Sequence, residues 1–251
     1  MLRGGKEAED ELHWLRTTLY SDCLDAIVET TDPGAPVLDI GCGVGHLVQY
    51  LSANGASAEG IEPSSDAVQV ARERGLKAEQ STLEGWAGKP ENAGRYRAVT
   101  LLNVLEHVPD PVRFLTLARS LVQPGGVVVF RVPNDFSEIQ EAAQRVTQRQ
   151  YWWVAAPDHI NYFSPESVGT TCDAVGLEPL EITADFPMEA FLLFGVNYVD
   201  AAERGKEAHR MRCNFELNLP KALRRKIYRA LSAVGVGRDL LVVARRPRSD
   251  R

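Results

Sequence analysis

Three glycines stand close together where an apolar stretch gives way to a helical pattern. Gly41, Gly43 and Gly45 follow Val37–Ile40, and His46–Ala53 comes directly after them. Glycine permits unusual backbone angles and leaves room for a ligand to lie against the main chain. The unpaired N–H groups and positive dipole end of the following helix suit a carboxylate or a phosphate. The loop is therefore a candidate ligand site, although a tight turn between packed elements also needs glycine.

An acidic residue ends the next apolar segment. Ser57–Ile61 predicts a strand, and Glu62 follows it directly, before Pro63. A carboxylate in this position can accept hydrogen bonds from both hydroxyl groups of a ribose. A strand, a glycine loop, a helix, a second strand and an acid in this order favour a nucleoside-containing cofactor over a purely structural turn.

The spacing of the glycines distinguishes two classes of cofactor. A dinucleotide fingerprint, GxGxxG, would place its third glycine at position 46. That position is His46, and the third glycine comes one residue earlier, so the loop reads GxGxG and is preceded by Asp39. The spacing counts against a nicotinamide-dependent oxidoreductase, which is kept as the alternative interpretation.

With this pattern the chain resembles the class I S-adenosylmethionine-dependent methyltransferases, and the resemblance extends through most of its length. Asp39–Gly45 is similar to the first motif of that family, Glu62 to its ribose-binding acid and Leu121–Gly126 to its LxPGG turn. Gln80–Glu84 falls where family members contact adenine, and Asn103–Val108 follows the fourth predicted strand.

The resemblance implies an α/β fold with a doubly wound, mostly parallel, seven-stranded Rossmann-like sheet and helical insertions. It also implies an enzyme that transfers a methyl group from S-adenosylmethionine to a small-molecule acceptor. A looser likeness to bacterial small-molecule methyltransferases suggests a sugar, or a precursor of a natural product or polysaccharide, as that acceptor. A non-catalytic protein that binds the cofactor is a further alternative, since methyl transfer requires few obligatory side chains. The implied cofactor-binding residues are Asp39, Gly41, Cys42, Gly43, Gly45, Glu62, Pro63, Thr82, Leu83 and Asn103.

Two histidines lie in loops on the predicted acceptor side and are candidates for a general base. His107 comes shortly after Asn103, and His159 lies in an aromatic-flanked polar segment. An unperturbed imidazole titrates near pH 6.5, so either could take a proton from a hydroxyl acceptor. His107 could instead hydrogen-bond the backbone beside the cofactor. The four cysteines form no CxxC pair, and we expect no metal site.

Alternating strand and helix patterns must position these residues, and they predict one methyltransferase domain over residues 1–251. It comprises an N-terminal helix at 7–30, a cofactor-binding core at 37–133, and acceptor-side insertions at 134–164 and 187–237. We expect residues 134–163 to be irregular and aromatic, with Trp152 and Trp153 either stacking on the acceptor or packing the insertion. Residues 187–237 are expected to be largely helical. Strands are predicted at 37–40, 57–61, 76–79, 97–102, 127–132, 177–182 and 240–244.

Composition and charge narrow the classes of protein. With 251 residues, of which 44% are hydrophobic and 25% charged, the chain is neither fibrous nor disordered. It has no apolar run that would span a membrane and no apolar leader near its first residue, so we expect a cytoplasmic protein. Residues 201–251 hold 14 Lys and Arg against 5 Asp and Glu, whereas residues 1–200 hold 14 against 29. The acidic bulk argues against nucleic-acid binding. The basic helix predicted at 219–234 could contact a membrane surface or a phosphorylated acceptor, or pack on its own domain.

Overall fold

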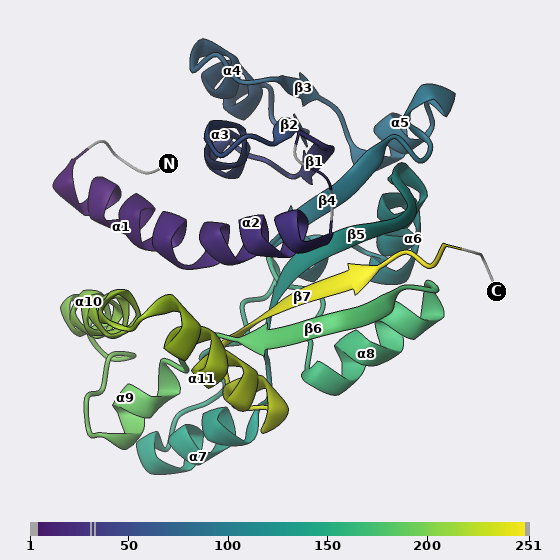
Figure 1. The fold of residues 1–251 in the computed structure, drawn as a ribbon. Helices are drawn as coiled ribbons and strands as arrows, with labels where there is room; N and C mark the ends of the chain where they lie inside the picture. The colour runs from purple at the N-terminus through teal and green to yellow at the C-terminus, as the bar shows by residue number, and fades with distance from the viewer. Residues whose placement is uncertain (1–4, 31, 33, 249–251) are drawn as a thin grey trace.

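A seven-stranded sheet forms the centre of the computed structural model, which describes residues 5–30, 32 and 34–248 (Figure 1). The strand order is β3-β2-β1-β4-β5-β7-β6. The first five strands in this order pair in parallel, and β7 runs antiparallel to both of its neighbours. The predicted mostly parallel, seven-stranded sheet is thus confirmed. The strands are β1 Pro36–Ile40, β2 Ser57–Glu62, β3 Ala78–Gln80, β4 Tyr96–Leu102, β5 Val122–Pro133, β6 Glu178–Ala184 and β7 Asp239–Arg245.

Helices cover both faces of this sheet, as a doubly wound fold requires. Trp86, Leu115 and Cys172 are buried on one face, where α5, α6 and α8 pack. Cys23 and Leu51 are buried on the other face, beneath α2 and α3. The helices are α1 Lys6–Thr17, α2 Leu19–Thr30, α3 His46–Ala53, α4 Ser65–Glu73, α5 Leu83–Ala87, α6 Pro111–Leu121, α7 Glu138–Thr147, α8 Pro165–Ala174, α9 Glu189–Leu193, α10 Ala202–Asn218 and α11 Lys221–Ala233, with 3-10 turns η1 Pro90–Asn92 and η2 Leu105–His107.

The single N-terminal helix predicted at 7–30 is divided into two. Thr18 separates α1 from α2 with φ −107° and ψ −91°, which are not helical angles. Its hydroxyl donates to the carbonyl oxygen of Trp14 at 2.7 Å. A threonine that bonds back to the carbonyl four residues earlier tends to bend a helix, and this explains the break in an otherwise continuous apolar pattern.

The first insertion is more regular than the irregular segment predicted at 134–163. Helix α7 occupies Glu138–Thr147, and the side-chain oxygen of Gln140 accepts a hydrogen bond from the backbone of Ser137 at 3.1 Å. This S-x-x-Q spacing is a helix-start signal, and it explains why the segment is helical where an irregular chain was predicted. The remainder, 148–163, forms turns and a single isolated bridge between Phe163 and Asn134.

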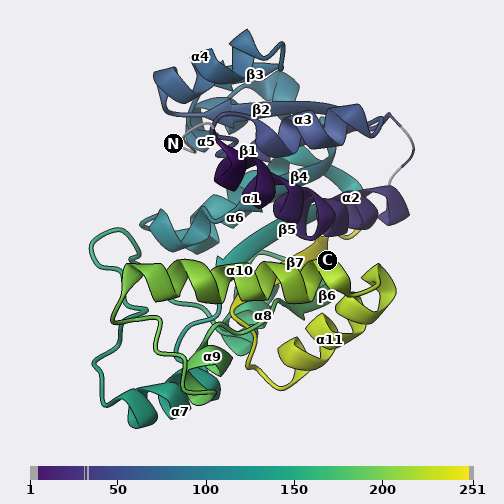
Figure 2. The same ribbon diagram turned by 90° about the vertical axis from the view of Figure 1, so that its left-hand side faces the viewer.

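The second insertion is largely helical, as predicted, and it approaches the N-terminal helices. Figure 2 shows α10 extended across the molecule below α1, and α9 and α11 lie below α10, on the side away from α1. The indole N–H of Trp14 in α1 donates to Glu216 in α10 at 2.6 Å. Among the described helices, none is both long and apolar enough to cross a membrane.

Candidate functional site

The glycine loop between β1 and α3 needs glycine for two different reasons. Gly41, Gly43 and Gly45 have φ of 73°, 53° and 80°, a region that L-residues rarely adopt. A Cβ on Gly41 would lie 2.9 Å from Val104, and one on Gly45 would lie 2.5 Å from Leu76. A Cβ on Gly43 would meet nothing within 4 Å. Packing therefore explains the outer two glycines, whereas Gly43 borders open space in which a ligand can approach the backbone.

Glu62 ends β2 directly beside this loop. Its Oε2 accepts a hydrogen bond from Gly43 N at 3.1 Å, and its Oε1 accepts one from Ser64 N at 2.9 Å. The carboxylate thus fixes the loop to the end of the neighbouring strand. An ionised carboxylate has about four acceptor positions, so two remain for other donors, such as ribose hydroxyls.

Asp39 and Cys42 are buried beneath the loop. The hydroxyl of Thr100 donates to Asp39 Oδ1 at 2.6 Å, and burial raises the pKa of Asp39 to about 7 despite this hydrogen bond. Burial also raises the pKa of Cys42 to about 12, so its thiol is neutral. Because the thiol lies against Gly60, contact of Cys42 with a cofactor would go through its main chain.

A cavity of about 420 Å³ opens beside the glycine loop. Its volume lies within the range of small-ligand pockets. The hydroxyl of Thr82 accepts a hydrogen bond from Gly85 N at 3.2 Å and so caps α5. Several predicted cofactor residues therefore meet at one cavity; its wall includes Ile40, Gly41, Pro63, Thr82, Leu83 and Phe114.

Asn103 follows β4 and is held by Arg131, which was not among the predicted site residues. Its φ is 57°, and its Oδ1 accepts a hydrogen bond from Arg131 Nη1 at 2.8 Å. The other guanidinium nitrogen of Arg131 lies 3.0 Å from Asp185 and 2.7 Å from Asp239. An arginine inside the apolar run of residues 127–132 was the available signal, because buried arginines require partners.

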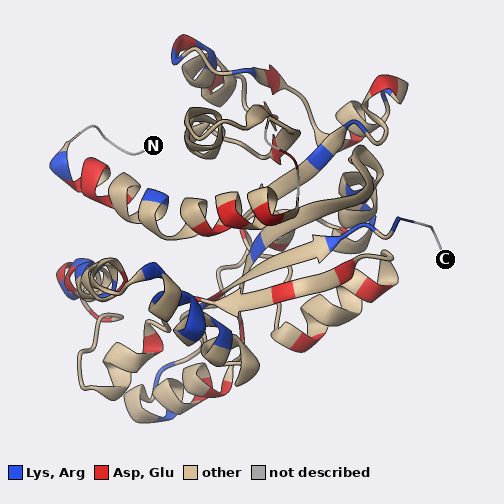
Figure 3. Ribbon diagram, viewed as in Figure 1, with Lys and Arg blue, Asp and Glu red and all other residues tan. Residues whose placement is uncertain are grey.

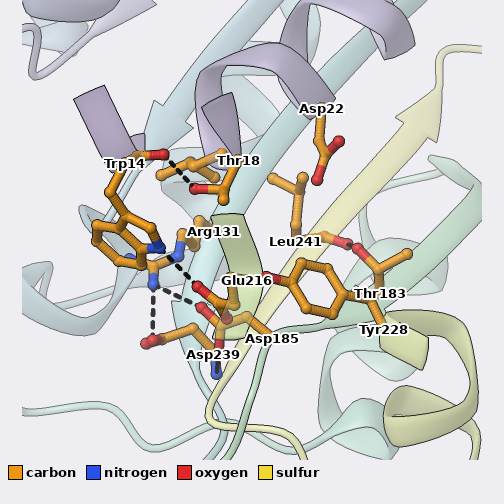
Figure 4. Close-up of a pocket in the computed structure, with 11 residues that line it drawn as sticks. Trp14, Thr18, Asp22, Arg131, Thr183, Asp185, Glu216, Tyr228, Asp239 and Leu241 are labelled. Atoms are coloured by element: carbon orange, nitrogen blue, oxygen red, sulfur yellow. Dashed lines mark hydrogen bonds and ion pairs between the residues drawn. The ribbon is translucent and has the colours of Figure 1, made fainter. Parts of the chain in front are cut away.

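Figure 4 shows that Arg131 belongs to a buried ionic cluster between α1, α10 and the sheet. Arg212 lies 2.6 Å from Asp185, and Glu216 accepts from Trp14. Burial would raise the pKa of Asp185, but Arg212 and Arg131 outweigh it and lower that pKa. The adjoining cavity measures only about 30 Å³, which suits a water molecule and no substrate. The cluster therefore serves to connect elements.

The two candidate histidines, far apart in sequence, lie together. The ring centroids of His107 and His159 are 4.9 Å apart with an interplanar angle of 80°. His107 Nδ1 lies 2.8 Å from the carbonyl oxygen of Asp158, and because a carbonyl oxygen can only accept, Nδ1 is the donor of this hydrogen bond. His159 Nδ1 is buried, with no hydrogen-bond partner among the described residues.

Backbone hydrogen bonds hold this histidine pair in place. The carbonyl oxygen of Glu106 accepts from Ile160 N at 2.9 Å and from Asn161 N at 3.2 Å. The side-chain amide of Asn161 also donates to the carbonyl oxygens of Leu105 at 3.0 Å and Val108 at 2.6 Å. The segment that carries His159 is therefore fixed onto η2, which carries His107.

Glu106 is a buried acid in the same cluster, and it was not among the predicted site residues. Its side chain is 1% exposed, and its Oε1 lies 3.9 Å from His107 Nε2. Glu106, His107 and His159 offer ligand atoms that all lie within 4.8 Å of one another. This arrangement is compatible with a divalent cation as well as with a proton. The wall of the 420 Å³ cavity includes the neighbouring Val104 and Val108 but none of these three residues.

Aromatic side chains of the first insertion pack mainly on one another. The ring of Phe136 lies 5.6 Å from that of Tyr151, 5.9 Å from Trp153 and 5.7 Å from Tyr162. Trp152 and Trp153 meet edge to face at 4.8 Å. These contacts favour the packing interpretation of the tryptophan pair.

Four of the five Lys and Arg residues of α11 form ion pairs within the molecule. Figure 3 shows where the basic positions lie along this helix. Lys221 lies 2.5 Å from Asp25, and Arg224 lies 2.9 Å from Asp22, both partners being on α2. Arg225 lies 3.0 Å from Glu181 on β6. The charge asymmetry of the sequence therefore has an intramolecular explanation. Contact of this helix with a membrane stays a prediction, and these ion pairs do not favour it.

The sequence of residues 12–182 matches the methyltransferase domain family. The chain belongs to that family. This membership confirms the resemblance that the glycine loop, the ribose acid and the LxPGG-like turn indicated.

Two relatives are ubiquinone biosynthesis O-methyltransferases. The enzyme of Vibrio parahaemolyticus is 40% identical over 119 residues, which cover 44% of this chain and 50% of the relative. That of Aromatoleum aromaticum is 33% identical over 157 residues, which cover 59% of this chain and 66% of the relative. The chain thus spans about half to two thirds of the length of these relatives.

The fold also has solved counterparts. An S-adenosylmethionine-dependent methyltransferase from Archaeoglobus fulgidus superposes with a TM-score of 0.60 at 16% identity, covering 94% of this chain and 97% of the other. At this identity the likeness supports the fold alone, and it confirms the Rossmann-like methyltransferase architecture.

Proposed function

We propose that this protein transfers the methyl group of S-adenosylmethionine to a hydroxyl oxygen of a small-molecule acceptor. The observation that carries the proposal is the GxGxG loop, in which Gly43 opens onto free space beside Glu62. The family of the chain supports methyl transfer. The relatives named O-methyltransferases support oxygen over nitrogen or carbon as the accepting atom.

The residues around the glycine loop fit the cofactor. Glu62 has acceptor positions left for ribose hydroxyls, and the cavity beside Pro63, Thr82 and Leu83 is large enough for an adenine ring. The backbone at Gly43, together with the N-terminal end of α3, suits the amino-acid portion of the cofactor. When bound, the cofactor supplies an already activated methyl group.

The protein's remaining task is to orient the acceptor, exclude water and remove a proton. A hydroxyl is a weak nucleophile until a base takes its proton, and this contribution is typically 10²- to 10⁴-fold. We assign that role to His159, whose ring lies against that of His107, and name His107 as the second candidate. Phe136 and Tyr151 pack on each other yet stay 46% and 49% exposed, so they offer apolar surface to an aromatic acceptor.

The acceptor class follows from the relatives only by analogy, so the experiment compares classes. Purified protein would be incubated with S-adenosylmethionine and with phenolic or catechol acceptors in parallel with sugar-linked ones. Release of S-adenosylhomocysteine would be measured. We expect turnover with a phenolic or catechol hydroxyl. Turnover with sugar hydroxyls alone would instead assign the acceptor to the sugar class.

Cofactor binding tests the two alternative functions. Calorimetry should detect S-adenosylhomocysteine binding and no binding of NADH. Preferential binding of NADH would overturn the assignment in favour of an oxidoreductase. Tight binding without turnover on any acceptor would favour the non-catalytic alternative.

The histidine assignment has its own test. His159→Ala should lower turnover about 10²- to 10⁴-fold and leave cofactor affinity within about twofold. His107→Ala provides the comparison, because both rings lie in one cluster but only His107 is bonded to Asp158. If His159→Ala turns over normally while His107→Ala does not, the base is His107.

A further inference from the structure

Away from the candidate site, three side chains with metal-binding atoms converge between α1 and α10. Glu11 lies on α1, and His209 and Cys213 lie one helical turn apart on α10. His209 Nε2 lies 2.7 Å from Glu11 Oε2 and 3.5 Å from Cys213 Sγ. All three ligand atoms lie within 4.8 Å of one another. This group is referred to below as the α1–α10 cluster.

Both partners of His209 contact the same ring nitrogen. In a catalytic Cys–His–acid arrangement the carboxylate would orient one ring nitrogen while the thiol contacts the other. Here the carboxylate oxygen and the sulfur both approach Nε2. The α1–α10 cluster therefore lacks the geometry of a proton relay, and its three ligand atoms surround one point in space.

The distances are close to those of a tetrahedral metal centre. With metal–nitrogen and metal–oxygen bonds of about 2.0–2.1 Å and metal–sulfur bonds of about 2.3 Å, neighbouring ligand atoms lie roughly 3.3–3.7 Å apart. The nitrogen–sulfur distance of 3.5 Å is within this range, and the nitrogen–oxygen distance of 2.7 Å is a hydrogen-bond length. Replacement of the shared proton by a metal ion requires that contact to lengthen by roughly half an ångström.

The surroundings hold the histidine while leaving the cluster accessible. The Trp14 ring meets His209 edge to face at 5.3 Å, and its N–H is anchored on Glu216. The side chains of His209 and Glu11 are 38% and 29% exposed, which leaves a path for an ion and room for water as a fourth ligand.

We propose that Glu11, His209 and Cys213 bind a zinc-class divalent ion, with water completing a tetrahedron that fastens α1 to α10. A thiolate, an imidazole and a carboxylate are the ligands that zinc prefers, whereas magnesium and calcium prefer oxygen alone. Binding forms metal–nitrogen, metal–sulfur and metal–oxygen bonds and releases the imidazolium proton and the thiol proton. The resulting centre, with one thiolate and one carboxylate around a divalent ion, is electrically neutral.

Cobalt substitution tests the proposal on the full-length, tag-free protein. One equivalent of Co²⁺ should produce a thiolate-to-cobalt charge-transfer absorption together with the visible bands of tetrahedral cobalt. The charge-transfer absorption is specific to the α1–α10 cluster, because Glu106, His107 and His159 contain no sulfur and the other three cysteines are buried. Absence of that absorption at one equivalent would overturn the proposal.

Matched variants separate metal binding from packing. Cys213→Ser and Glu11→Gln should each weaken Zn²⁺ affinity about 10²-fold or more, measured by competition with a chelating dye, while far-ultraviolet circular dichroism confirms folding. His13→Gln, an exposed histidine on the same helix, should change the affinity less than twofold. Undiminished Zn²⁺ affinity in both folded ligand variants would contradict the site. These measurements do not depend on methyl transfer, so they test the metal site separately from the proposed function.

Discussion

Both carboxylate oxygens of Glu62 accept backbone hydrogen bonds, one from Gly43 and one from Ser64. The same carboxylate is the proposed partner of the ribose hydroxyls. We predict that Glu62→Ala weakens the binding of S-adenosylhomocysteine by about 1.5–3 kcal/mol, the range for hydrogen bonds to a charged group. Calorimetry would measure this loss. Glu79→Ala, an exposed acid on the neighbouring β3, is the control and should bind normally. An unchanged dissociation constant for folded Glu62→Ala would place the ribose elsewhere.

A second residue-scale prediction concerns the buried carboxyl of Asp39. Its folded pKa, about 7, lies above the ordinary value of 3.8 because burial disfavours the ionised form. The folded state therefore holds this proton more tightly than the unfolded chain does, and the contribution to stability falls as pH rises from about 4 to about 7. Asp39→Asn removes this dependence and still accepts a hydrogen bond from Thr100.

The measurement is urea unfolding of both proteins without cofactor at two pH values. Relative to wild type, Asp39→Asn should gain about 2–3 kcal/mol in unfolding free energy between pH 5 and pH 8. All other titrating groups are common to both proteins and cancel in the difference. If the two stability profiles run parallel, the carboxyl titrates at its ordinary pKa and the stated effect of burial is refuted.

At the scale of elements, the packing of α11 on α2 depends on a buried ion pair. Arg224 is 1% exposed, lies 2.9 Å from Asp22 and also donates to the carbonyl oxygen of Thr17. Arg224→Met should cost about 3–5 kcal/mol, because it leaves a buried acid without its partner. Thermal or urea unfolding would measure the loss.

Two further variants make the effect specific to that ion pair. The double variant Arg224→Met with Asp22→Leu should regain most of the lost stability, since no uncompensated charge is left. Arg229 is a half-exposed residue of the same helix α11, and it pairs with Glu181 on β6. Arg229→Met should therefore cost less than about 1 kcal/mol. Equal losses from Arg224→Met and Arg229→Met would show that burial of the pair has no special weight.

The elements could largely be predicted from the sequence because short-range patterns define them. Asp110 caps α6 through the backbone N–H of Arg113, and Pro111 follows it as the first residue of the helix. Where the prediction of elements was wrong, a local detail decided the outcome. The hydroxyl of Thr18 breaks the N-terminal helix, and the Ser137–Gln140 pair begins α7 inside a segment dominated by its aromatic residues.

In the candidate site, the cofactor-binding residues could be predicted from the sequence, but the arrangement of the acceptor-side histidines could not. The cofactor loop is a continuous motif, so its residues could be identified from their order and spacing. The pairing of His107 with His159 could not, because the hydrogen bonds of Asn161 to the carbonyl oxygens of Leu105 and Val108 produce it. Such contacts depend on the path of a long loop, and residue types at local spacings do not encode them.

For the molecule as a whole, contacts between the two ends of the sequence dominate one flank. Trp14 bonds to Glu216, and Asp22 pairs with Arg224, so the N-terminal and C-terminal helices stabilise each other. The family match ends at residue 182, inside β6, and it therefore omits α10, α11 and β7. Residues 12–182 are thus a region of common ancestry and do not form a complete folding unit.

The position of β7 in the sheet means that the sheet cannot be completed until the end of translation. Strand β7 lies between β5 and β6 in the sheet, yet the ribosome makes it last of the seven. At roughly 5–20 residues per second, several seconds separate the emergence of β6 from that of β7. Throughout that interval β5 and β6 present unpaired edges, which invite aggregation or chaperone binding. Nascent chains stalled when only residues up to 238 have left the ribosome should therefore be cleaved rapidly by protease. Chains extended by a linker, so that all residues up to 251 have left the ribosome, should resist cleavage.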